Sequence, residues 1–192
     1  SRVENVSFKG QIKSKGGNSV TAGIAGTNAM SLVKRAYVEA DIWVKSGQNA
    51  GMLVAQNFTN YSGAGWGNWG KLTQSVAKGK LEDAGSRNAA GIAASIWPYG
   101  TINDTVSYAT VVNGKELFSS DNEITDAWMG QKLQNLFGVQ GQSSGTKTGK
   151  DAKFRRLTEA EAEQKVKSYR ITALEETSAN EVTTEKLNAA IL

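Results

Sequence analysis

Aromatic and basic side chains supply most of the binding chemistry that the sequence offers. Alternation over residues 37–45 places Tyr37 and Trp43 on a polar strand face, and Trp97 falls opposite the apolar side of residues 90–97. Bases of a single strand stack on such rings, each contributing about 1–3 kcal/mol. Three further aromatics, Tyr61, Trp66 and Trp69, lie in a glycine-rich stretch that could close over a bound strand. The basic residues expected to contact phosphates are Lys9, Lys13, Lys45, Lys78, Lys80 and Arg87.

Catalytic chemistry finds little support in the residue types. The sequence has no histidine and no cysteine, so the commonest general base, the commonest metal ligand and thiolate chemistry are all missing. The acidic pairs Glu82-Asp83 and Glu175-Glu176 are adjacent in sequence, and neighbours on a strand point to opposite faces. Residues 63–70 lack the Gly-Lys-Ser/Thr ending of a phosphate-binding loop. We therefore expect no enzyme, no catalytic residue, no metal site and no cofactor.

The bulk composition is that of a globular protein with a mildly basic surface. The chain has 192 residues, 39% of them hydrophobic, and a net charge of +4. No apolar run approaches the length of a membrane span, so we expect no membrane partner. A basic body with a second basic stretch near residues 141–158 suits a polyanion, although charged stretches are also commonly just solvated. The expected location is the cytoplasm or a virion.

Hydrophobic alternation predicts strands over residues 3–13, 19–26, 37–45, 72–81 and 90–97. The pattern is clearest at 37–45, where Val38, Ala40, Ile42 and Val44 share one face. Residues 48–57 suit a short helix between the third and fourth strands. A further strand at 106–112 would end in the Asn113-Gly114 turn.

The pattern becomes helical beyond residue 118. Apolar residues at helical spacing predict a helix over 124–137, and a Gly/Ser/Thr/Lys-rich linker follows. Thr158 and Glu161 form a capping box that opens a helix to about Glu176, and a similar signal at 178–181 opens a last short helix. The expected domains are a β-rich body at 1–118, a helix packing on it at 119–140, a flexible basic linker at 141–156 and a helical appendage at 157–192.

Five strands with a helix between the third and fourth match an oligonucleotide-binding barrel, that is, an α+β fold with a five-stranded OB-like β-barrel. Residues 6–12 (VSFKGQI), 16–25, 37–50, 75–81 and 90–97 resemble the five strands of the single-stranded-DNA-binding protein family. The resemblance covers about residues 2–97. The chain ends in NAAIL rather than in that family's acidic tail, so the resemblance is to a divergent phage or plasmid member. It also accounts for the echo between residues 2–12 and 71–81, because strands one and four of that family are alike.

The sequence therefore predicts a non-catalytic protein that binds single-stranded DNA through stacking and phosphate contacts, as a homo-oligomer. Two alternatives stay open. High glycine and alanine suit a structural subunit of a phage virion or another repeated assembly, and the hairpin signal at 112–115 suits an extracellular β-sandwich that binds glycans. Trp43 and Trp97 could equally cover the C-terminal helices or a subunit interface.

Overall fold

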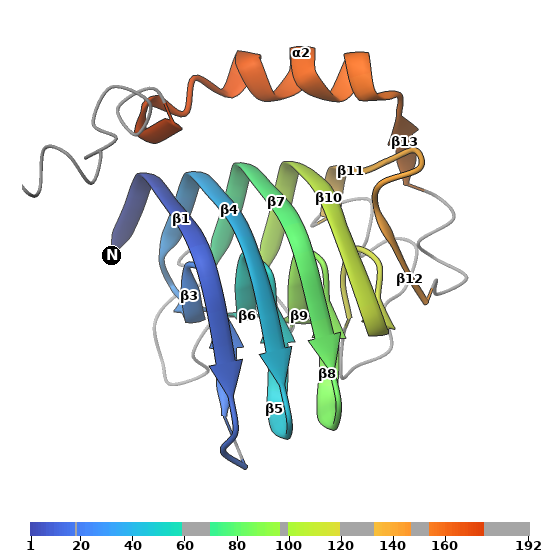
Figure 1. Cartoon of the computed structure of the whole chain (residues 1–192). Coiled ribbons are helices and arrows are strands. Elements are labelled where there is room, and N and C mark those ends of the chain that lie inside the picture. Colours follow the sequence, from blue (N-terminus) through green and yellow to red (C-terminus); the bar gives the residue numbers. More distant parts are fainter. Residues whose placement is uncertain (18, 59–69, 97–99, 120–132, 147–153, 175–192) are drawn as a thin grey trace, which may run out of the picture.

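The strands of this protein run parallel and coil in successive turns (Figure 1). The structure, a computed structural model, describes residues 1–17, 19–58, 70–96, 100–119, 133–146 and 154–174. Every strand pair within these residues is parallel, and each strand pairs with the strand that occupies the same place one turn later. Arg2, for example, pairs with Leu32, and Leu32 pairs with Lys71. This arrangement is a parallel β-helix.

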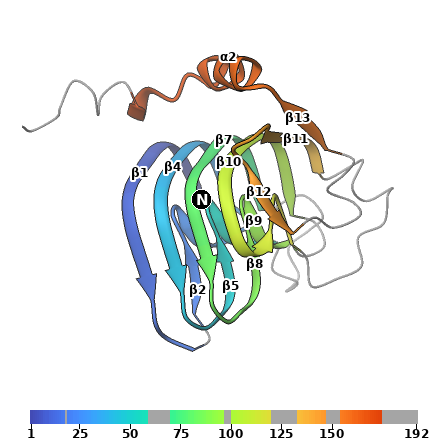
Figure 2. The same cartoon turned by 45° about the vertical axis from the view of Figure 1, so that its right-hand side comes forward.

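Each of the first three turns contributes three strands, one to each face of the coil. The long strands of the first face stand side by side, with the shorter strands of the other two faces below and behind them (Figures 1 and 2). The strands, turn by turn, are β1 (Arg2–Ser14), β2 (Val20–Ala22) and β3 (Ala25–Ala29), then β4 (Leu32–Val44), β5 (Gly47–Gly51) and β6 (Val54–Phe58), then β7 (Lys71–Asp83), β8 (Ser86–Ala90) and β9 (Ala93–Ile96).

The fourth turn continues the coil. Strand β10 (Thr101–Lys115) pairs with β7 along most of its length, and its last residue, Lys115, pairs with Ala90 of β8. Beyond it lie β11 (Leu133–Val139), β12 (Ser144–Thr146), β13 (Arg155–Leu157) and helix α2 (Glu159–Tyr169). Strands β11 and β12 pair with β10, and β13 pairs with β11.

This topology corrects the expected five-stranded OB-like barrel with a helical C-terminal region. The strands predicted over 3–13, 37–45 and 72–81 exist, but they stack as equivalent strands of consecutive turns instead of closing a barrel. The echo between residues 2–12 and 71–81 has the same cause, because β1 and β7 occupy the same place in the first and third turns.

Three of the predicted local elements are also wrong. Residues 48–57 lie in strands β5 and β6 and not in a helix, and Asn113-Gly114 lies inside β10 instead of ending a hairpin. Of the helix predicted over 124–137, residues 133–137 belong to strand β11, and the rest lies outside the described residues. The capping box is confirmed, since the Thr158 side chain accepts from the Glu161 N–H and Glu161 accepts from the Thr158 N–H. The signal at 178–181 is outside the described residues.

A left-handed residue recurs at one place in every turn of the first face. Such a backbone costs a residue with a β-carbon roughly 1–2 kcal/mol, and asparagine and aspartate tolerate it best. The strand register skips this position, so the chain bends at the same height in each turn. The five residues and their φ angles are Asn5 (58°), Arg35 (55°), Gln74 (49°), Asp104 (54°) and Asn135 (53°).

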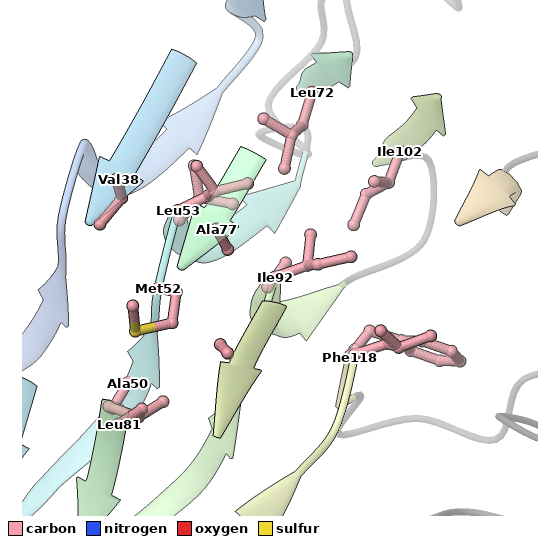
Figure 3. Packing of buried hydrophobic residues seen from close by; sticks show 14 of the residues in the cluster. Val38, Ala50, Met52, Leu53, Leu72, Ala77, Leu81, Ile92, Ile102 and Phe118 are labelled. Atoms are coloured by element: carbon pink, nitrogen blue, oxygen red, sulfur yellow. The ribbon is translucent and has the colours of Figure 1, made fainter. Parts of the chain in front are cut away.

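The interior is filled by aligned rows of side chains from successive turns. Figure 3 shows Val38, Met52, Leu53 and Ile92 pointing into the core that the three faces enclose. Space is tight beside the backbone. A β-carbon on Gly79, which has a φ of 108°, would lie 2.2 Å from the Ala40 carbonyl oxygen of the turn before.

Asparagine side chains at two places in the coil form hydrogen bonds from one turn to the next. Asn28 Nδ2 donates to Asn57 Oδ1 at 2.8 Å, and Asn57 Nδ2 donates to the Thr101 carbonyl oxygen at 3.1 Å. On another face, Asn88 Nδ2 donates to Asn49 Oδ1 at 3.1 Å. Asn28, Asn49 and Asn57 are buried, and an unsatisfied buried amide would cost about 1–3 kcal/mol.

The C-terminal strap, residues 157–174, crosses the outside of the first face near the starts of its strands (Figure 1). It contains α2 and covers an outward apolar row formed by Tyr37, Val76, Val106 and Phe137. Its far end reaches β1, where Asn5 Nδ2 donates to Thr172 Oγ1 and the Ala173 N–H donates to Asn5 Oδ1 at 3.3 Å. Within the described residues, no helix is long and apolar enough to cross a membrane.

An ion pair between the partly exposed Arg156, just before the strap, and the buried Glu116 ties this part of the chain to the fourth turn. Glu116 is fully buried, and its two carboxylate oxygens accept from Arg156 Nη1 and Nη2 at 2.5 Å each. The Ser143 hydroxyl also donates to Glu116 Oε1 at 2.8 Å. Removing one partner of a buried pair is strongly destabilising, because the remaining charge stays buried without its partner.

We expect Arg156→Ala to lower the free energy of unfolding by about 3–5 kcal/mol, since it leaves the Glu116 carboxylate without its main partner. Urea unfolding followed by circular dichroism measures the change. The control is Arg155→Ala, which removes an exposed pair with Glu161 and should cost no more than about 1 kcal/mol. Equal losses in the two variants would contradict a special role for the buried pair.

Candidate functional site

Side chains that point outward from β1, β4 and β7 form three polar rows across the first face. These strands alternate, so every second residue after the left-handed corner faces away from the core. Each row takes one residue from each strand at the paired position. The rows are Lys9, Glu39 and Lys78, then Gln11, Asp41 and Lys80, then Lys13, Trp43 and Glu82.

The first row is internally paired and lies next to the strap. Glu39 binds Lys78 at 3.0 Å and Lys9 at 3.6 Å, and it accepts from the Tyr37 hydroxyl at 3.0 Å. The hydrogen bond from Lys78 is the main cause that lowers the pKa of Glu39. Burial raises the pKa of the Tyr37 hydroxyl, and the hydrogen bond to Glu39 adds to the increase. Tyr37 is therefore occupied by its own neighbours and presents no free stacking surface.

The other two rows line a shallow groove of about 240 Å³ on the same face. Trp43 is half-buried there, between Lys13 of the preceding turn and Glu82 of the following one. The groove is lined by the outward side chains of Gln11, Lys13, Asp41, Trp43, Lys80 and Glu82, together with Ile12 and Ile42.

The groove offers charges of both signs beside one aromatic ring. Lys80 Nζ lies 2.7 Å from Glu82 Oε2, and this hydrogen bond raises the pKa of the lysine. Within the described part of the chain, the side chains of Lys13, Asp41 and Trp43 make no hydrogen bond or ion pair. These three groups are available to a ligand, and the rigid strands below them fix their spacing.

The structure brings together some of the residues selected from the sequence. Lys13, Trp43 and Lys80 share the groove, while Lys9, Lys78 and Tyr37 lie beside it around Glu39. Lys45 is exposed just after the end of β4. Arg87 belongs to β8, but its side chain is not described. Four selected residues lie outside the described residues: Tyr61, Trp66, Trp69 and Trp97.

The sequence reasoning missed three groove residues, Gln11, Asp41 and Glu82. The alternation that placed Trp43 outward also placed Asp41 on the same face, so the signal for this residue was present. Only aromatic and basic residues were selected, because a polyanion partner was assumed. Asp41 and Glu82 make a polyanion an unfavourable ligand for this groove, because their carboxylates would repel phosphates.

The residues of this chain do not fit a catalytic zinc site. Such sites take three protein ligands, which are most often histidine with glutamate, aspartate or cysteine. The sequence supplies no histidine or cysteine. Among the described residues, no three acidic side chains are grouped so that they could hold a metal ion.

Comparison with known proteins gives one informative match. The chain is 35% identical over 166 residues to a protein named zinc metalloprotease ZmpB from Streptococcus pneumoniae serotype 4. The match covers 85% of this chain, but the chain spans only 9% of the length of that relative. No family model matches the chain. No solved structure matches it either.

This match overturns three expectations from the sequence. The chain is similar to part of a protein named as a protease, and not to the single-stranded-DNA-binding family. The predicted function as a non-catalytic DNA-binding protein is wrong, and so is the expectation that no enzyme is involved, because the relative is named an enzyme. The alternatives of a virion subunit and a glycan-binding β-sandwich gain no support from the match or from the fold.

We expect zinc to leave the thermal stability of the 192-residue chain unchanged, because the chain lacks suitable donors. A ligand at 100 times its Kd would stabilise the native state by about 2.7 kcal/mol. Each kcal/mol raises the Tm of a domain of this size by about 2–4 °C. The measurement is thermal unfolding with added Zn²⁺ and with EDTA. One zinc per chain retained through gel filtration would contradict the expectation.

Proposed function

We propose that this chain is a β-helical part of a zinc metalloprotease, and that another part of the same polypeptide holds the zinc. The observation that carries the proposal is the 35% identity to a protein of that name over 85% of this chain. The share of the relative that is matched, 9% of its length, leaves ample sequence for a catalytic domain elsewhere. This chain has no histidine or cysteine, and its described residues hold no group of three possible metal ligands, which supports placing the zinc in another part of the polypeptide.

Within such an enzyme, we propose that the groove around Trp43 contacts the polypeptide substrate away from the bond that is cleaved. A polypeptide carries both charge signs, backbone donors and acceptors, and apolar side chains. The groove offers Lys13 and the exposed Asp41 as charges of opposite sign, neither of them in an ion pair within the described chain, and the Trp43 ring as an apolar surface. Binding energy from such remote contacts lowers the barrier of the chemical step when it helps to hold the substrate in place.

The first test is to search the complete reading frame that encodes this chain for a zinc-binding motif. If the proposal is correct, the frame encodes a His-Glu-x-x-His helix outside the 192 residues, because that motif supplies two zinc ligands and the general base of many metalloproteases. Sequencing the complete frame gives the answer. The purified complete polypeptide should also contain zinc and lose its peptidase activity on chelation. A complete frame without a zinc-binding motif would contradict the proposal.

The second test addresses the groove in the complete polypeptide. We expect Trp43→Ala to raise the KM for a folded protein substrate roughly tenfold, which corresponds to the loss of about 1.4 kcal/mol of contact. Cleavage of a short peptide that spans only the scissile bond should not change, since such a peptide does not reach the groove. Lys71→Ala, an exposed substitution on the same face but outside the groove, is the control. An equal effect of Trp43→Ala on both substrates would show a structural role instead.

A further inference from the structure

All three strands of the first turn lie at sheet edges. Strands β1 and β2 end the order of the large sheet at its two sides, and β3 ends the order of the smaller sheet. On the side away from the second turn, none of the three pairs with another strand of the described chain. A long edge of unpaired N–H and C=O groups is a template for another strand. Strand β1 is thirteen residues long, and the backbone groups of every second residue point to this unpaired side while the others bond to β4.

The apolar interior is also open at the first turn. The inward side chains Val6, Phe8 and Ile12 are only partly buried, whereas their paired residues one turn later, Ala36, Val38 and Ile42, are at most 1% exposed. The large hydrophobic residues classed as exposed in the described chain, Val3 at 37% and Met30 at 38%, both belong to this end. Repeat proteins normally close such an end with a polar terminal unit.

Nothing in the described chain closes this end. The C-terminal strap touches β1 only near its start, through Asn5 and Ser7, and it lies on the outer face and not over the edge. The interior rows that run through the later turns therefore stop at Val6, Phe8 and Ile12 with one side uncovered.

The outward residues of β1 indicate the charge that a covering strand would carry. Lys9, Gln11 and Lys13 face Glu39, Asp41 and Trp43 on one side only. Opposite charges in neighbouring strands stabilise a sheet, and like charges destabilise it. An acidic side chain opposite Lys9 would extend the charge alternation of the first row, Lys9, Glu39 and Lys78. An acidic side chain opposite Lys13 would give this lysine an oppositely charged neighbour, which Trp43 does not supply.

We propose that this end binds a further β-helical turn, supplied by the polypeptide that precedes Ser1 in the metalloprotease. The proposal rests on the proposed function, because it needs a longer chain. Continuity with the observed stacking supports it: β1 pairs with the strand that begins thirty residues later, and β7 pairs with β10 at the same interval. The added turn would place apolar side chains over Val6, Phe8 and Ile12, and acidic ones beside Lys9 and Lys13.

The experiment compares the 192-residue chain with the same chain extended by the roughly 40 residues encoded before it, a length that covers one turn. Hydrogen exchange is measured for peptides from Arg2–Ser14 and, as an internal control, from Thr101–Lys115. We expect the β1 amides that point to the free side to exchange at least about tenfold more slowly in the extended chain, because they become paired, while β10 exchange stays the same. Unchanged exchange in β1 would overturn the proposal.

A charge-reversal variant tests the expected chemistry of the added turn. Lys13→Glu in the extended chain should remove part of the new protection, whereas Lys71→Glu, on β7 away from the edge, should not. Sedimentation of the 192-residue chain over a range of concentrations tests whether a second copy of the chain occupies the edge instead. A dimer that protects β1 without the added residues would assign the edge to a second copy and overturn the proposal. The result is separate from the search for a zinc-binding motif, so either proposal can fail alone.

Discussion

Parallel stacking in register is the constraint on which the rest of this structure depends. Each strand hydrogen-bonds to the strand at the same place in the next turn, so any departure from the common path must occur in every turn or break the ladder. The left-handed corner shows this most directly. Asn5, Asp104 and Asn135 adopt the conformation at low cost, but Arg35 and Gln74 adopt it too, although neither type favours it. The stacked backbone, more than the local residue, determines the conformation there.

The same corner connects the coil to its covering strap. Asp104 accepts from the Tyr169 hydroxyl at 3.2 Å and binds Lys165 at 2.6 Å, while Asn5 holds Ala173 at the other end. The strap thus follows the row of corners across the first face and buries the apolar row directly beyond it. The remaining part of that face, farther along the strands, is not covered by any described residue and carries the groove around Trp43.

The local parts of this fold could be predicted from the sequence, and the pairing could not. Alternation located β1, β4 and β7 because their apolar residues all point to the interior of the coil, and the capping box located the start of α2. The helix predicted over residues 48–57 was wrong because two short strands lie there, separated by the buried corner residues Met52 and Leu53. This arrangement spaces the apolar residues as a helix also would. Residues 2–12 and 71–81 resemble each other, and the resemblance fits two strands of one barrel as well as equivalent strands in two turns of a coil. Only contacts between distant residues distinguish the two arrangements. The echo at residues 71–81 was visible, but alternation alone carries no information on which strands are neighbours.

The groove and the open end depend on each other through the rigidity of the coil. The groove side chains come from β1, β4 and β7, so one of its walls is the edge strand itself. Gln11 and Lys13 can keep a fixed distance from Trp43 only while β1 stays paired along its length, and among the described residues β1 pairs with a strand on one side alone. A turn stacked on the free edge would fix that wall and would also join the groove to the polypeptide that carries it. For the proposed role in a protease, this connection matters, because contacts far from the cleaved bond aid the chemical step only when the parts of the enzyme hold a constant spacing.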